Sequence, residues 1–225
     1  MTTGILKGLG AMTIFATAIA AMPAQAAFVM VLDDPNDNLA ATTIYDGTGS
    51  DLNGVEGVIT YSGNVGAFTV NVTTGVSKPA IGPGALDLNS INVSGAAGTL
   101  LVSISDTDFQ TTDTAYQASF GGTTSGSVDL AFLYDNANQA FGGTAFASDS
   151  FSAGVVNDSF ANQLVGNVSA GVPFSLTIST RIRHDDANQV TSFDAAIAPV
   201  PLPASVWLLG SALGGLGMLR RRHKS

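Results

Sequence analysis

The sequence predicts an all-β fold: an antiparallel β-sandwich, jelly-roll-like, flanked by an N-terminal signal peptide and a C-terminal apolar helix. Apolar and polar residues alternate, most clearly from Phe174 to Ile182, as in a strand with one face in a core. Glycine, asparagine and aspartate separate such runs, as turns require. Between residues 27 and 198 no long stretch has the apolar repeat of an amphipathic helix.

In chain order, eight runs fit the strand pattern, and about ten strands are expected in all. The runs are 55–61, 68–72, 86–93, 100–104, 116–120, 128–134, 174–182 and 193–197. Phe68, Val70 and Val72 form the expected inward set of the second run. In the third run the apolar phase slips after Leu88, which predicts a bulge or turn near Asn89-Ser90. Turns are expected at Asp46-Gly47, Ser62-Gly63-Asn64, Gly121-Gly122, Asp135-Asn136, Gly142-Gly143 and Asp185-Asp186.

The first 26 residues have the features of a signal peptide. A basic residue, Lys7, precedes an apolar run from Leu9 to Ala21. Ala24 and Ala26 then fit the small-x-small rule for signal peptidase, so cleavage is expected after Ala26. The alternative, an uncleaved N-terminal membrane anchor, would export the following residues equally. Residues 27–198 are therefore expected to form one exported domain, which we call the body.

The C-terminal segment, residues 199–225, has three parts in a fixed order. A proline-containing hinge leads into an uncharged apolar stretch from Ala204 to Leu219, and a basic cluster follows. At about 1.5 Å per residue the apolar stretch would span roughly 24 Å, less than the hydrocarbon core of about 30 Å. It is therefore expected to be a short transmembrane helix that holds the chain temporarily, with the basic cluster on the cytoplasmic side. The hinge and cluster residues are Val200, Pro201, Leu202, Pro203, Ala204, Arg220, Arg221 and Arg222.

This tail resembles the PEP-CTERM sorting signal in its Val-Pro-Leu-Pro-Ala variant. The resemblance implies an exported protein of a Gram-negative bacterium that an exosortase recognises and processes. It also implies a transient stay in the inner membrane and a final location at the cell surface or outside the cell. Segments of the body, such as Ile104–Phe109 and Tyr134–Asn138, are similar to those of other proteins with this tail, for which no activity is established.

The body is strongly acidic and contains no cysteine. Its three basic residues stand against all 17 acidic residues of the chain, a net charge of −14. Such a charge repels nucleic acid, which excludes DNA or RNA as a partner. Without cysteine there are no disulfides and no thiolate chemistry. Eleven of the twelve phenylalanines and all four tyrosines lie in the body, enough to fill one core.

Nothing in the body predicts an enzyme. Its only histidine, His184, follows two outward arginines and precedes an Asp-Asp turn, so it is expected to be a solvated residue at a strand end. No Gly-x-Ser-x-Gly motif precedes it, and a zinc site would lack a second histidine.

Calcium is the one metal for which the sequence offers candidate ligands, and otherwise no cofactor is expected. Calcium prefers oxygen ligands, and the segment 33–38 concentrates carboxylates and amides. The spacing departs from an EF-hand at Leu39 and Tyr45. The alternative is ordinary turn and capping chemistry. The candidate ligands are Asp33, Asp34, Asp37, Asp106 and Asp108.

The leading functional hypothesis follows from the tail: a structural protein of the exopolysaccharide matrix of a biofilm, with signal peptidase, exosortase and exopolysaccharide as partners. The alternative is a secreted carbohydrate-binding or ice-binding β-sandwich module. Sugar-binding faces favour exposed tryptophan, whereas the only tryptophan, Trp207, lies in the tail. Threonine pairs in the body show no period that would match ice.

Overall fold

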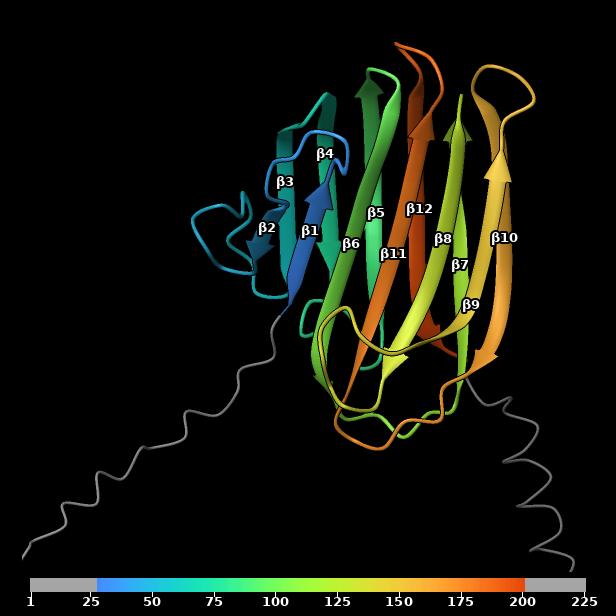
Figure 1. The fold of residues 1–225 in the computed structure, drawn as a ribbon. Coiled ribbons are helices and arrows are strands. Elements are labelled where there is room, and N and C mark those ends of the chain that lie inside the picture. The colour runs from blue at the N-terminus through green and yellow to red at the C-terminus, as the bar shows by residue number, and fades with distance from the viewer. Residues whose placement is uncertain (1–27, 201–225) are drawn as a thin grey trace, which may run out of the picture.

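The computed structural model describes residues 28–200, except for the side chains of residues 90–92. These residues form twelve β-strands and no helix (Figure 1). The strands are β1 (Val29–Asp33), β2 (Thr42–Tyr45), β3 (Val58–Val65), β4 (Phe68–Val76), β5 (Leu86–Gly95), β6 (Gly98–Phe109), β7 (Ala115–Thr124), β8 (Ser127–Asp135), β9 (Thr144–Ser152), β10 (Asp158–Asn167), β11 (Phe174–His184) and β12 (Val190–Pro199). Within residues 28–200 there is thus no helix that could cross a membrane.

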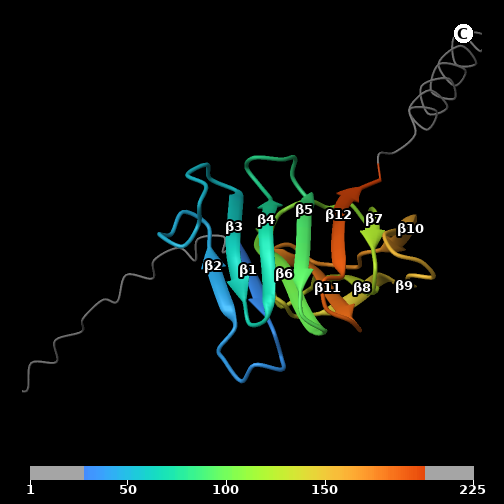
Figure 2. The same cartoon turned by 90° about the horizontal axis from the view of Figure 1, so that it is seen from above.

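The strands make two six-stranded antiparallel sheets, which confirms the predicted β-sandwich. The first sheet has the order β2-β1-β6-β11-β8-β9, and the second has the order β10-β7-β12-β5-β4-β3. Figure 1 shows β6, β11 and β8 in front of β5, β12 and β7, and Figure 2 shows the two layers from above. From β6 to β8 the chain crosses to the second sheet for β7 and returns, so central strands of both sheets alternate in sequence.

Alternating side chains from both sheets fill the space between them. Phe120 of β7 and Phe132 of β8 bring their rings to 5.8 Å across the two layers. At the edge formed by β9 and β10, Phe151 and Phe160 stack at 5.1 Å. Burying a side chain of this size contributes about 1.5–3 kcal/mol, so the aromatic residues supply a large part of the driving force.

The predicted bulge is present. Along the β12–β5 ladder, Phe193 faces Ile91 but Ala195 faces Leu88, so Asn89-Ser90 stands opposite the single residue Asp194. The extra residue explains why the apolar phase of β5 slips there.

Three details of the predicted pattern are wrong. Val72 is 46% exposed, because the β3–β4 register shifts and turns it out of the core. Gly121-Gly122 lies inside β7 instead of in a turn. A Cβ on Gly122 would come within 2.2 Å of Ser192 O, so glycine is needed for close packing of β12. Ser62-Gly63-Asn64 likewise lies within β3, at the same register shift.

The outer face of β11 is polar as predicted, but only its C-terminal half is exposed to solvent. Arg181 and Arg183 are exposed, whereas Ser175 and Thr177 are buried. The β8–β9 connection folds back over them: Ser175 Oγ donates to Gln139 O at 2.7 Å, and Phe141 N donates to Ser105 Oγ at 3.1 Å.

Candidate functional site

The acidic loop after β1 is organised by hydrogen bonds of its own. Asp34 is buried, and its carboxylate accepts bonds from Asn36 N and Asn36 Nδ2, both at 3.0 Å, and from Ala67 N at 3.2 Å. Asp37 accepts from Leu39 N at 2.7 Å. Both carboxylates approach Gly66, whose φ of 54° lies in the left-handed region. Asp33 is the last residue of β1 and pairs with Leu101. These contacts are turn and capping chemistry.

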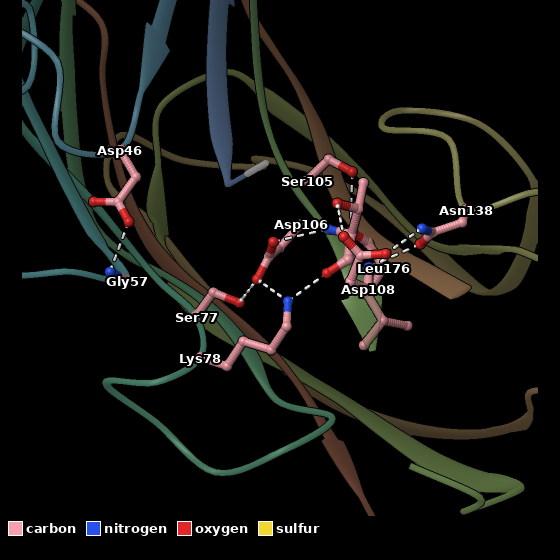
Figure 3. A network of polar contacts seen from close by, with 10 residues as sticks. Asp46, Gly57, Ser77, Lys78, Ser105, Asp106, Asp108, Asn138 and Leu176 are labelled. Carbon is pink, nitrogen blue, oxygen red and sulfur yellow. Dashed lines mark hydrogen bonds and ion pairs between the residues drawn. The ribbon is translucent and has the colours of Figure 1, made fainter. Parts of the chain in front are cut away.

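Asp106 is buried and forms an ion pair with a partly exposed lysine. Its Oδ2 accepts from Lys78 Nζ at 2.7 Å and from Ser77 Oγ at 2.6 Å, which joins the β4–β5 connection to β6 (Figure 3). Lys78 also donates to Thr107 O, and its ammonium lies 4.2 Å from the ring centre of Phe109. The ammonium occupies the position that a metal cation would need beside Asp106.

Asp108 turns to a different partner. Its backbone has a φ of 60°, which directs the side chain to the β8–β9 connection, where Asn138 Nδ2 donates to Asp108 Oδ1 at 2.6 Å (Figure 3). In return Asp108 N donates to Asn138 Oδ1 at 2.8 Å. Asp106 and Asp108 therefore bind separate loops. Among residues 28–200, no three histidine or acidic side chains are placed to hold one metal ion.

His184 is buried, so the expectation of a solvated residue is wrong. It is 1% exposed, its Nε2 lies 3.0 Å from Thr191 Oγ1, and its ring centre is 5.8 Å from that of Phe68. Burial lowers its pKa, and the nearby Asp185 charge opposes that shift. The cause is the length of β11: the strand continues through His184, which points inward in phase with Ile182.

The outer face of the second sheet carries an open hollow of about 650 Å³, which we call the trough. Its small residues leave the space: Ser119 and Gly121 on β7, Ala161 on β10 and Ala196 on β12. A Cβ on Gly121 would lie 3.3 Å from both Ala161 Cβ and Phe160 O. The absence of a side chain at Gly121 therefore leaves the floor of the trough open. The other residues that line it are Asp87, Asn89, Phe120, Asn162, Gln163, Asp194 and Ala195.

The polar side chains that line the trough are two acids, three amides and the hydroxyl of Ser119. Asp87 lies on β5 opposite Ala196, and Asp194 precedes Ala196 by two residues, so the two carboxyl groups are diagonal neighbours on adjacent strands. Burial raises the pKa of the Asp87 carboxyl, and the negative charge of Asp194 raises it further. Among residues 28–200, no basic residue lines the trough. The arrangement can hydrogen-bond a hydroxyl-rich or amine-bearing ligand.

Sequence reasoning missed the trough because its residues come from four strands, of which β10 matches no predicted run and the other three are longer than their predicted runs. The only local signal was the bulge at Asn89-Ser90, which places Asn89 beside the trough. The signal-peptide residues Ala24 and Ala26 and the tail residues from Pro201 onward lie outside the described residues. Val200 is described, and its N–H donates to Ala115 O at 2.9 Å, directly after β12.

Comparison with known proteins places this chain near no sequence family. No protein-family profile matches it, and no curated protein matches it. Among solved structures it is similar to a family 6 carbohydrate-binding module of lichenase 5A from Cellvibrio mixtus, solved with cellotriose, at 13% identity, a TM-score of 0.31, and coverage of 57% of this chain and 86% of that one.

It is also similar to a family 4 carbohydrate-binding module (10% identity, TM-score 0.33, 64% and 86% covered). A third similar structure is the xylan-binding domain CBM22-1 of Paenibacillus barcinonensis Xyn10C, at 17% identity and a TM-score of 0.31, with 64% of this chain and 95% of that one covered. TM-scores at this level leave the function to be argued from this chain's own residues.

Proposed function

We propose that the chain is an exported protein whose jelly-roll-like sandwich binds polysaccharide in the trough, and whose tail is an exosortase sorting signal. The trough is the observation that carries the binding proposal. It is open and large enough for sugar rings to lie along it, with Asp87, Asn89 and Gln163 at its sides. Carboxylate and amide groups pair with the hydroxyls that surround a sugar ring.

The trough would hold sugar by hydrogen bonds more than by stacking. Phe120, the aromatic residue among the described residues that line it, is 8% exposed and belongs to the core. Stacking platforms are a common source of affinity for sugars. A polymer with many repeats compensates for weak single sites when several copies of the protein are displayed together. This suits a protein held in or near an exopolysaccharide, which links the binding proposal to the matrix role that the tail implies.

Binding can be tested by filling the trough. Ala196→Phe places a ring on its floor, and Thr69→Phe is the matched control, because Thr69 is exposed on β4 of the same sheet but does not line the trough. The full chain, in mild detergent, would be run through gels that contain neutral, amino or acidic polysaccharides. We expect at least one polysaccharide to retard the unaltered chain and the Thr69→Phe chain but not the Ala196→Phe chain. Equal migration of all three chains in every gel contradicts the proposal.

The sorting proposal rests on the order of hinge, apolar stretch and basic cluster in residues 199–225. Mass spectrometry of the protein from the culture medium tests it. The expected mature chain begins at Ala27 and lacks Arg220–Arg222. Cleavage beyond Val200 would leave β12 whole, because that strand ends at Pro199. Extracellular protein that still ends at Ser225 would contradict exosortase processing.

A further inference from the structure

We propose that the trough prefers glycans with free amino groups over neutral or acidic glycans of the same length. This inference rests on the proposed polysaccharide binding and names its ligand class. It follows from the charges that line the trough and from the place of Asp87 and Asp194 in the sheet.

The charges exclude an acidic ligand. Asp87 and Asp194 line the trough and no basic residue does. The described residues contain three basic side chains, none of them available there. Lys78 is paired with Asp106, and Arg181 and Arg183 line a hollow on the outer face of the opposite sheet. A uronate or sulfate group in the trough would therefore be repelled by the carboxylates, and none of the described residues that line the trough carries a positive charge.

The geometry favours a cation between the two carboxylates. Asp194 stands in the bulge, two residues from the strand partner of Asp87, and the two carboxyl groups are near enough for their charges to interact, so one ammonium group can approach both. The bulge at Asn89-Ser90 faces Asp194 and adds the Asn89 amide at the same place. Burial raises the pKa of Asp87 most, and the nearby negative charge of Asp194 raises it further, so the two carboxylates repel each other. A protonated sugar amine would remove that repulsion, whereas an acetylated amine would not.

The test compares three sets of oligosaccharides of equal length: oligomers of glucosamine, the same oligomers fully N-acetylated, and oligouronates. Calorimetric titration of the full chain in mild detergent, at a pH where the amines are protonated, gives each dissociation constant. We expect the glucosamine oligomers to bind about tenfold more tightly than the acetylated ones, which corresponds to one charge-assisted contact. Oligouronates should bind most weakly.

The variants separate this site from general attraction to an acidic protein. Asp87→Asn and Asp194→Asn keep the shape of the side chain and remove one charge each from the trough. Asp129→Asn removes one charge from the exposed outer face of the opposite sheet. The amine preference should fall several-fold in the two trough variants and stay unchanged in Asp129→Asn. Unfolding midpoints would be measured for each variant to establish that all are folded.

Other results decide against the inference in distinguishable ways. If Asp129→Asn lowers the preference as much as the trough variants do, the attraction is nonspecific and the amine site is refuted. If acetylated or acidic oligomers bind as tightly as the amines, and Ala196→Phe abolishes that binding, polysaccharide binding stands and the amine preference falls. If no glycan binds, both proposals fall.

Discussion

His184 makes the stability of the protein depend on pH. Because burial lowers its pKa in the folded state, the unfolded chain takes up a proton more readily. The free energy of unfolding should therefore be constant above about pH 7.5 and fall as the pH drops through the unfolded pKa of about 6.5. Urea unfolding between pH 8 and pH 5 measures this, with His184→Gln as the reference. The slope should be shallower in the variant, and parallel profiles would contradict the assignment.

The ion pair of Lys78 and Asp106 predicts unequal costs for removing its two partners. Lys78 is 23% exposed on its side chain and can turn to water, whereas Asp106 is 1% exposed and cannot. Lys78→Met therefore leaves a buried charge and should cost about 3 kcal/mol. Asp106→Asn keeps the bond from Ser77 and should cost about 1 kcal/mol.

Urea unfolding at pH 7 tests that asymmetry. The double variant with both substitutions should be more stable than Lys78→Met alone, because it contains no buried charge. Equal losses in the two single variants would mean that Asp106 is solvated after the substitution.

Whether a residue's role can be predicted from sequence depends on how far its partners lie along the chain. The inward position of His184 could be predicted from the local sequence, since it continues the alternation of Phe174 to Ile182. The pairing of Asp106 with Lys78 was not, because 28 residues separate them and only the packing of the sheets brings them together. The same holds for Asp87 and Asp194, whose proximity depends on β5 and β12 being neighbours.

Among the strands, the pattern predicted those of the sandwich centre and missed several at its edges. In β9 the register shifts near Phe146, so that Phe146 and Phe151 both pack on the core despite their odd spacing. In β10 a polar residue, Asn162, stands where an apolar one is expected, and it donates to Asp149 Oδ2 at 2.7 Å across the open edge. Both departures disguise the alternation on which strand prediction relies.

Phe160 joins the two strands of the edge made by β9 and β10 to each other and to the core. Phe160 is 8% exposed and packs against Phe151 and Phe120, so Phe160→Ala should cost about 3 kcal/mol. Val165 on the same strand is 67% exposed, and Val165→Ala should change stability by less than about 0.5 kcal/mol. Hydrogen exchange of the Phe160→Ala variant should show β9 and β10 losing protection before β6 and β11. Uniform loss over all strands would mean that the edge has no independent stability.

At the scale of the whole molecule, the net charge of −14 on the body predicts that salt stabilises the fold by screening the acids from one another. A calcium site would make CaCl₂ more stabilising than NaCl of the same ionic strength. However, Asp34, Asp106 and Asp108 already accept hydrogen bonds from their own surroundings, and Asp106 faces an ammonium. We therefore expect NaCl and CaCl₂ of equal ionic strength to raise the melting temperature by the same few degrees.

A larger rise in calcium would place an ion in the loop after β1, where Asp34 and Asp37 approach each other over Gly66. Calcium at 100 times its dissociation constant would add about 2.7 kcal/mol, an effect well above the difference in screening. Asp34→Ala with Asp37→Ala would then remove the excess, whereas Asp185→Ala with Asp186→Ala, in the exposed β11–β12 turn, would leave it in place. If the rises are equal, the acids of this loop shape the turn and bind no ion.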